Sequence, residues 1–218
     1  MNVLDVDLDF FTSQVLYENA RSPREKSAAT PWSIDRVDHF LRHYCGLSSK
    51  APGLVVEQHR DVYYFARDSE KRGLVATRNL WIHVDSHSDL GFGTPAMEYL
   101  AHGDFVTNYG PSVNSNNFLL ALLSTGHIEE LHCVYNRSSL PDYDPAMLRR
   151  TSGGYAFDNH IGTPEISFHR YTETDFVWNA SVDFVFLTLS PEYTNERFFD
   201  VADYIRTTFI EEVSFVGA

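Results

Sequence analysis

The sequence predicts a single α/β domain over residues 1–218, in which helices cover both faces of a mainly parallel sheet. Segments of strand type alternate with segments of helical periodicity along the chain. Several strand segments are continuous apolar runs, which is typical of parallel strands that helices bury on both faces. No internal repeat, low-complexity tract or linker divides the chain. We therefore expect three layers, α/β/α, in one domain.

The expected strands are short apolar segments. Residues 1–11 form the first strand, and the apolar run 54–56 continues into Glu57, Gln58 and His59. Further strands are expected at residues 79–84, 130–135, 165–171 and 183–189, with a short edge strand at 213–216.

Four segments have the spacing of helices, at residues 32–44, 62–72, 116–124 and 198–210. Ser33 is placed to cap the first of these helices, and Gly46 fits its end. Gly73 and Gly126 fit the ends of the second and third helices. The composition of residues 13–30, 91–95 and 136–164 indicates loops.

The overall charge narrows the class of partner. The chain carries 17 Lys and Arg against 30 Asp and Glu, a formal charge of −13 at pH 7. Nucleic-acid binding needs clustered basic residues, so we expect no nucleic-acid partner. A negative field attracts cations and favours a cationic substrate, although an acidic composition equally serves solubility alone.

Cysteine usage and hydropathy indicate a cytoplasmic protein that does not enter a membrane. Cys45 and Cys133 lie far apart without CxxC spacing, which disfavours a disulfide framework and fits a reducing cytosol. The first residues lack the basic and apolar regions of a secretory signal. No apolar run reaches the roughly 20 residues that a membrane helix needs.

The clearest chemical signal is the run His-Val-Asp-Ser-His-Ser-Asp from His83 to Asp89. On an extended backbone, Asp85, His87 and Asp89 point to the same side. Grouped carboxylates in a partly buried place repel one another, and a divalent cation offsets that repulsion. His83 faces the same way and either orients a metal ligand or simply packs at the strand start. The run therefore predicts a metal site.

A second acidic cluster, Asp5, Asp7 and Asp9, alternates with apolar residues in the first strand. A strand that helices cover on both faces offers this charge no solvent, so a metal is the expected partner. His59 is a weaker candidate when taken alone. In such sheets, ligands bind outside the carboxyl ends of the strands, which is where we expect these residues and Glu192.

The ligand types narrow the choice of metal. Mostly carboxylate oxygens with one or two imidazoles suit Mn²⁺, Fe²⁺ or Co²⁺, and Zn²⁺ is possible. Four or more carboxylates favour two ions, which at a separation of about 3.5–4 Å hold a bridging hydroxide. The residues thus favour a two-metal hydrolase over a protein with a single ion.

These motifs resemble those of the arginase and agmatinase family. Asp-Ser-His-Ser-Asp at 85–89 is similar to the family's Asp-Ala-His-x-Asp metal motif, and Asp7-Leu8-Asp9-Phe10 is similar to its Asp-x-Asp motif. Together with Val-Val-Glu-x-His at 55–59 and Asn-Asn-Phe-Leu-Leu at 116–120, they resemble a smaller, arginase-like branch. That branch includes the peptide arginases of ribosomal-peptide (RiPP) biosynthesis.

The resemblance implies an arginase-like fold and two Mn²⁺ ions per chain. Asp85 and Asp89 are each expected to contact a metal, with one carboxylate bridging the two. The full ligand set that it implies is Asp7, Asp9, His59, Asp85, His87 and Asp89. His87 and His59 are expected to bind different ions, and Asp5 is the register alternative to Asp9. In arginases the Asp-x-Asp strand follows the histidine-containing one, whereas here it comes first, so we expect a circular permutation.

The resemblance also suggests residues for catalysis and substrate binding. His102 follows Asp89 at the interval at which arginases carry a proton-shuttling histidine; the alternative is an ordinary loop histidine. Glu192 corresponds to a glutamate that binds the substrate guanidinium, although it would also suit the N-terminal dipole of the last helix. Asn116, at the start of an expected helix, is assigned to substrate binding.

The function that follows is Mn²⁺-dependent hydrolysis of arginine side chains to ornithine and urea in a precursor peptide, the expected partner. Asp89 is expected to accept the proton of the attacking hydroxide, and His102 to protonate the leaving amine. Three alternatives stay open. The substrate is free arginine, agmatine or another small guanidine; the reaction is a metal-dependent deacylation; or the protein binds metal or peptide without turnover.

Overall fold

The computed structural model describes residues 1–13, 29–74, 76, 78–90, 113–139, 148–151, 154–157 and 166–214. Its strands are β1 (Asn2–Asp7), β2 (Ala51–Val56), β3 (Asn79–Asp85), β4 (Ile128–Tyr135), β5 (Leu148–Thr151), β6 (Gly154–Phe157), β7 (Ser167–Thr172), β8 (Phe184–Thr188) and β9 (Ile210–Glu212). Its helices are α2 (Ile34–His43), α3 (His59–Lys71), α5 (Phe118–Ser124) and α6 (Phe199–Phe209), with 3₁₀ turns η1 (Leu8–Phe11) and η5 (Glu196–Phe198).

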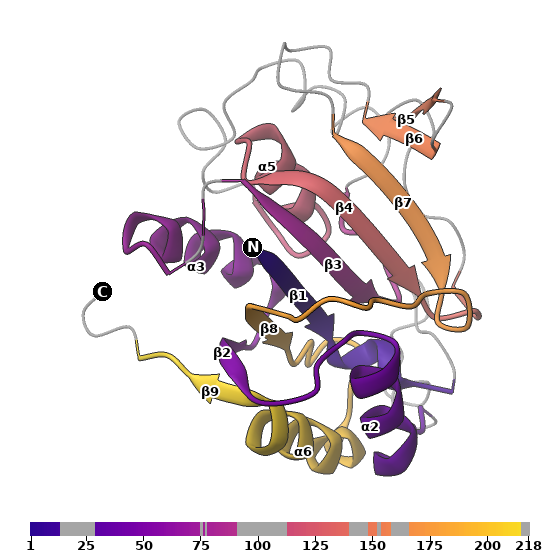
Figure 1. Cartoon of the computed structure of the whole chain (residues 1–218). Coiled ribbons are helices and arrows are strands. Elements are labelled where there is room, and N and C mark those ends of the chain that lie inside the picture. Colours follow the sequence, from indigo (N-terminus) through magenta and orange to yellow (C-terminus); the bar gives the residue numbers. More distant parts are fainter. Residues whose placement is uncertain are drawn as a thin grey trace.

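All described strands belong to one sheet in the order β5-β6-β7-β4-β3-β1-β8-β2-β9 (Figure 1). From β7 to β9, every neighbouring pair is parallel. The hairpin of β5 and β6 is antiparallel and extends one edge. The mainly parallel α/β sheet expected from the sequence is therefore confirmed.

Helices cover both faces of this sheet (Figure 1). On one face, Val3 of β1 and Trp81 of β3 lie in a core that includes residues of α3 and α5. On the other face, Leu4 and Val6 of β1 share a core with residues of α2 and α6. Because side chains alternate along a strand, the odd-numbered residues of β1 lie on the α3/α5 side. Asp5 and Asp7 are on that side, so the acidic cluster belongs to one face.

Both ends of α2 are set by residues that the sequence indicated, Ser33 and Gly46. The Ser33 side chain accepts a hydrogen bond from the backbone N–H of Arg36 and caps α2. Gly46 follows that helix with φ at 71°, and a Cβ there would come within 2.4 Å of the Ala180 carbonyl oxygen. Only glycine fits this turn without strain.

Three predicted elements near the site are wrong in detail. The strand expected over 1–11 ends at Asp7, because the Asp7 carboxylate accepts the Asp9 N–H and starts a 3₁₀ turn. His59 does not end a strand; it is the first residue of α3. The helix expected from Asn116 begins at Phe118.

Two further segments differ from the prediction. An edge strand lies at Ile210–Glu212, directly after α6, where it pairs with β2, and residues 215 and 216 of the segment expected at 213–216 lie outside the described residues. The segment 136–164 contains β5 and β6, although its composition indicates a loop. Pairing in the sheet supplies backbone hydrogen bonds that override weak local propensity at both places.

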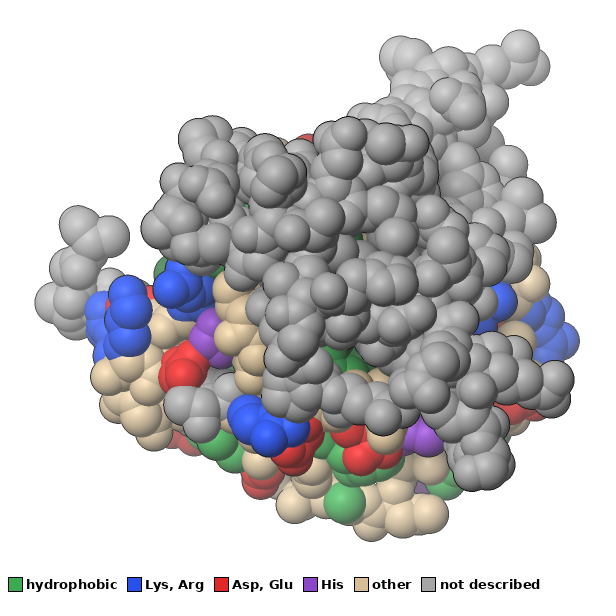
Figure 2. All heavy atoms as spheres, turned by 90° about the horizontal axis from the view of Figure 1, so that it is seen from above, with side chains coloured by type: hydrophobic (Ala, Val, Ile, Leu, Met, Phe, Trp, Pro, Cys, Tyr) green, Lys and Arg blue, Asp and Glu red, His purple; other side chains and the backbone are tan. Residues whose placement is uncertain are grey.

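The visible face in Figure 2 shows its coloured basic side chains in separate groups beside acidic ones. Among the described helices, none combines the length and the apolar character that crossing a membrane requires.

The close contact between β2 and β8 allows a test of the register in which these two strands pair. A Cβ on Gly53 would lie 2.4 Å from the Val185 carbonyl oxygen, so Gly53→Ala must separate two parallel strands. We expect a loss of about 1–3 kcal/mol in the free energy of unfolding, measured by urea denaturation. Glu211→Ala is the control, since Glu211 is an exposed residue of β9, which pairs with the other edge of β2. Unchanged stability of Gly53→Ala would contradict the register.

Candidate metal centre

The acidic and histidine residues singled out in the sequence meet at the carboxyl ends of β1 and β3. These two strands are parallel neighbours, with Asp5 paired to His83 in register. Asp7 and Asp85 end β1 and β3, respectively. His59, at the start of α3, reaches over the same edge, which is where parallel sheets bind their ligands.

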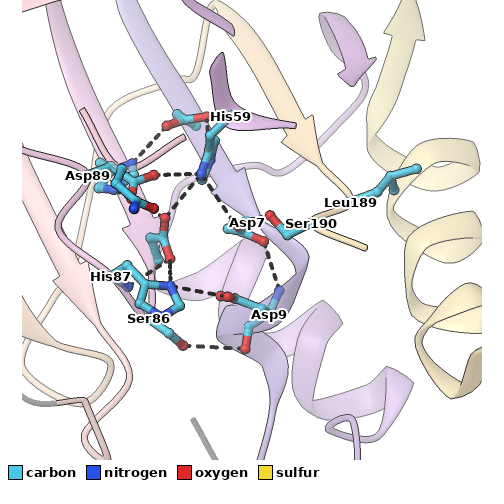
Figure 3. A network of polar contacts seen from close by, with 12 residues as sticks. Asp7, Asp9, His59, Ser86, His87, Asp89, Leu189 and Ser190 are labelled. Atoms are coloured by element: carbon cyan, nitrogen blue, oxygen red, sulfur yellow. Dashed lines mark hydrogen bonds and ion pairs between the residues drawn. The ribbon is translucent and has the colours of Figure 1, made fainter. Parts of the chain in front are cut away.

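His59 is the hub of the cluster (Figure 3). Its Nδ1 lies 2.7 Å from Oδ2 of Asp89, 3.2 Å from Oδ2 of Asp7 and 3.3 Å from Oδ2 of Asp85. Its ring stacks on Phe118 of α5 with centroids 4.7 Å apart, which fixes its orientation. One ring nitrogen therefore faces three carboxylates that come from two strands and a loop.

His87 and Asp9 form the second part of the cluster (Figure 3). Nδ1 of His87 lies 3.2 Å from Oδ2 of Asp9 and 3.5 Å from Oδ1 of Asp85. The backbone N–H of His87 also donates to Oδ1 of Asp85 at 2.8 Å. Asp85 thus lies between His59 and His87.

The expectation that Asp85, His87 and Asp89 converge by alternating along an extended strand is wrong. β3 ends at Asp85, so Asp85, His87 and Asp89 do not alternate on an extended backbone. Instead the Asp85 carboxylate turns the chain by accepting the His87 N–H. Asp89 then adopts a left-handed conformation with φ at 50°. This conformation is strained for a non-glycine residue, and such strain is concentrated at functional sites.

His83 and Asp5 form a buried pair at the inner end of the cluster. Nδ1 of His83 lies 2.8 Å from Oδ2 of Asp5, and Nε2 of His83 lies 3.5 Å from Oδ2 of Asp85. Oδ1 of Asp5 is 3.5 Å from Nε2 of His59. His83 therefore contacts two of the acids, in keeping with the orienting role considered from the sequence.

The loop after β8 adds a residue that the sequence did not indicate. Ser190 donates its hydroxyl to Oδ2 of Asp7 at 2.5 Å. Its backbone is also left-handed, with φ at 42°. The signal that could have found it is its place just after a buried strand, because β8 pairs with β1 and ends beside Asp7.

Burial of so many carboxylates shifts their protonation. Burial and the neighbouring Asp9 and Asp85 raise the pKa of Asp7 well above its ordinary value. Burial, with Asp89 and Asp9, raises the pKa of Asp85 to about 7. Asp5 differs: its burial opposes ionisation, but His59 and His83 outweigh that effect and lower its pKa to about 2.

The pKa values of two histidines in the cluster are also raised, although burial by itself acts on them in the opposite direction. Burial alone lowers a histidine pKa, but Asp5, Asp7 and Asp89 raise the pKa of His59 well above its usual value. Asp9 and Asp85 likewise outweigh burial at His87 and raise its pKa. Without a cation, the cluster therefore retains protons that the same residues would release in water.

Several buried atoms of the cluster have no hydrogen-bond partner, although buried polar atoms nearly always have one. These atoms are Oδ1 of Asp5, both Oδ atoms of Asp9, Nε2 of His59, Nε2 of His83, Oδ2 of Asp85 and Oδ2 of Asp89. Ligand atoms close enough to hold one ion occur in the groups Asp7–His59–Asp85, Asp9–Asp85–His87, His83–Asp85–Asp89 and Asp5–His59–His83. The residues fit a divalent metal, and Asp85 belongs to three of the four groups.

A pocket of about 310 Å³ opens onto this cluster. Asp7, His59, His87 and Asp89 line its acidic side. Its other described lining residues are Gln58, Arg60, Asn114, Ser115, Asn116, Ser190, Glu192 and Tyr193. A small polar ligand in this pocket would therefore touch the candidate metal ligands directly.

Both substrate-binding candidates line this pocket. Oε1 of Glu192 accepts a hydrogen bond from Nε2 of Gln58 at 3.0 Å. The alternative role of Glu192 at the N-terminus of the last helix is wrong, because α6 begins only at Phe199. Asn116 also lines the pocket, in the turn before α5. His102 lies outside the described residues.

Of the pocket residues that the sequence did not indicate, two contact residues of the site. Tyr193 packs its ring against His87, with centroids 4.6 Å apart and planes at 39°. Gln58, just before α3, holds Glu192 as described. Neither a glutamine nor a tyrosine indicates a site by itself. Gln58 reaches the pocket from the junction of β2 with α3, and Tyr193 reaches it from the loop after β8.

Comparison with known proteins identifies no family for this chain. No protein-family model matches the sequence, and no curated protein matches it.

The protonation of the cluster predicts how metal and pH act together. The raised pKa values of Asp85, His59 and His87 mean that the folded, metal-free protein binds more protons than the unfolded chain. Its stability must then fall as pH rises from about 6 to about 8. A divalent cation replaces these protons. We expect Mn²⁺ to raise the melting temperature more at pH 8 than at pH 6.

Differential scanning fluorimetry with and without Mn²⁺ measures both effects. Asp85→Asn removes the carboxylate shared by three metal groups. In this variant Mn²⁺ should no longer raise the melting temperature. The melting temperature of the metal-free variant should also fall less between pH 6 and pH 8 than that of the wild type. A metal-free protein that becomes more stable between these pH values would contradict the assigned protonation.

Proposed function

We propose that this protein is a binuclear, manganese-dependent hydrolase that converts arginine side chains of a peptide into ornithine and urea. The observation that carries the proposal is a pocket lined both by four residues of the buried cluster, Asp7, His59, His87 and Asp89, and by a separate carboxylate, Glu192. The cluster supplies a metal site, and Glu192 supplies a partner for a guanidinium. The resemblance of the 85–89 and 7–10 motifs to arginases supports the same assignment.

Two overlapping ligand groups support two ions. Asp7, His59 and Asp85 form one group, and Asp9, Asp85 and His87 form the other. Asp85 belongs to both and would be the bridging carboxylate. Asp89 lies 2.7 Å from His59 and would complete the first group. This oxygen-rich set suits Mn²⁺, and Fe²⁺, Co²⁺ and Zn²⁺ are the other candidates.

The chemistry divides between the metal and the chain. When bound, a pair of divalent ions activates water as a nucleophile at neutral pH. Glu192 binds the substrate guanidinium through paired, charge-assisted hydrogen bonds and presents its carbon to the cluster. Water adds to that carbon, the bond to the side-chain nitrogen breaks, and urea and the ornithine amine leave. Asp89, at the pocket wall, accepts the proton that water loses and returns it to the amine.

The charge of the chain also supports a cationic substrate. The formal charge is −13, and Asp7, Asp89 and Glu192 line the pocket. Under this proposal the chain is an arginase-like enzyme whose Asp-x-Asp strand precedes the histidine-containing strand, a circular permutation. Its partner would be an arginine-containing precursor peptide in the cytoplasm.

A peptide assay tests the activity. Protein loaded with Mn²⁺ should convert arginine to ornithine in a peptide, as read by mass spectrometry, and release urea. Glu192→Gln should lower kcat/KM by about 10–100-fold, because a charged hydrogen bond to the guanidinium is lost. Its metal content should not change, since Glu192 belongs to none of the ligand groups.

Glu196→Gln is the matched control, since Glu196 is an exposed glutamate in η5 outside the pocket. A chain that contains two metal ions but leaves both peptidyl arginine and small guanidines intact would overturn the proposal. Release of acetate from an acetylated lysine peptide would select the deacylase alternative.

One observation favours a small guanidine substrate. Arg60 is the only basic residue other than histidine among the described pocket-lining residues. Its guanidinium is partly exposed and lies 3.7 Å from Asp61, a weak exposed ion pair. It is placed to pair with the carboxylate of free arginine, which an arginine inside a peptide lacks.

Arg60→Ala distinguishes the two substrates. If free arginine is the substrate, the KM for arginine should rise about tenfold or more, while kcat changes little. If peptidyl arginine is the substrate, the same variant should retain its kcat/KM for the peptide. Steady-state urea release with both substrates measures the difference, and Arg72→Ala, at the C-terminal cap of α3 and outside the pocket, is the control.

A further inference from the structure

A second group of metal-ligating side chains lies on the opposite face of the sheet. Glu130 and His132 are two residues apart in β4, so both point to one face. His169 of β7 is the register partner of His132. In β3 the partner of His132 is Ile82, whereas His83 belongs to the metal centre and alternates with Ile82. The group is therefore separated from the centre by the sheet itself.

The ligand atoms of this second group converge. Nε2 of His132 lies 2.9 Å from Oε1 of Glu130, and Nε2 of His169 lies 3.3 Å from the same oxygen. Zinc bonds of about 2.0–2.1 Å in a tetrahedron separate neighbouring ligand atoms by about 3.3 Å. All three ligand atoms lie within 4.8 Å of one another. A small adjustment of side chains is enough to enclose an ion.

The surroundings hold the His132 ring in place. It stacks on His169 with centroids 4.6 Å apart, lies parallel to Tyr171 and meets the edge of Trp178. The side chain is only 8% exposed, and its Nδ1 has no hydrogen-bond partner. Burial, reinforced by His169, lowers the pKa of His132 despite Glu130.

We propose that Glu130, His132 and His169 form a mononuclear site for Zn²⁺ or a similar borderline divalent cation. Two imidazoles and one glutamate are a ligand set of single-zinc sites that keep water in the fourth position. The side chains of His169 and Glu130 are 27% and 37% exposed, which gives the ion and its water access. The nitrogen-rich set selects zinc, whereas the carboxylate-rich centre favours harder ions.

Such an ion would cross-link β4 to β7. His132 and His169 come from these two strands, and β7 joins the hairpin of β5 and β6 to the parallel sheet. Zinc at this point would therefore stabilise the outer edge of the sheet. This inference is independent of the proposed hydrolase activity, because no residue of the group lines the pocket.

Counting bound zinc tests the site. The full chain is freed of metal with a chelator, dialysed against Zn²⁺ and analysed by inductively coupled plasma mass spectrometry. We expect His169→Gln to bind one Zn²⁺ fewer per chain than the wild type, and Asp85→Asn to retain that ion. With Co²⁺ as the probe, His169→Gln should lose the visible absorption of a four-coordinate site.

Two further variants make the result decisive. Glu130→Gln changes a partly exposed side chain, so it should fold even where His169→Gln does not, and it should also lose one Zn²⁺. Glu129→Gln is the matched control, since Glu129 is an exposed neighbour of Glu130 in β4 and belongs to none of the ligand groups. Equal zinc content in the wild type, His169→Gln and Glu130→Gln, or loss of the ion in Glu129→Gln, would overturn the proposal.

Discussion

The structure depends on one electrostatic constraint: carboxylates gathered at the end of a parallel sheet where almost no solvent reaches them. Asp5, Asp7, Asp9, Asp85 and Asp89 are all buried, and helices and apolar side chains surround them. Charges in such a place are costly unless they are paired. Three histidines and the retained protons offset part of the cost, and a divalent cation would offset more. The arrangement therefore suits a divalent cation.

The parallel topology makes this concentration of charge possible. β1 and β3 run side by side, so acids at their ends are neighbours although they are far apart in the sequence. α3 begins at the same edge and brings His59 between them. Two non-glycine residues of the site, Asp89 and Ser190, adopt left-handed backbone conformations. The surrounding sheet compensates for this strain, as is expected of a site that trades stability for function.

The two faces of the sheet carry different sets of candidate metal ligands. On the α3/α5 side the donors are mostly carboxylate oxygens, and a pocket with Glu192 adjoins them. On the other side two imidazoles and one glutamate converge next to an aromatic shell. Because donor type governs metal preference, the two proposed sites would differ in the divalent ions that they favour.

The sequence by itself determined the class of fold and the residues of the acidic cluster. Continuous apolar strands require burial on both faces, and Asp-x-Asp or Asp-x-His-x-Asp in such a setting requires a counter-charge. Local chemistry also determined the Ser33 cap and the turn at Gly46, because both act over a few residues.

Only the tertiary structure decided how the cluster is built. The expected strand alternation failed beyond Asp7 and Asp85, since each carboxylate captures a backbone N–H two residues later and bends the chain. Ser190, Gln58 and the Glu130–His132–His169 group depend on strand order and register, which join residues distant in sequence. Sequence patterns record which face a residue occupies, whereas contacts between strands depend on the arrangement of the whole sheet.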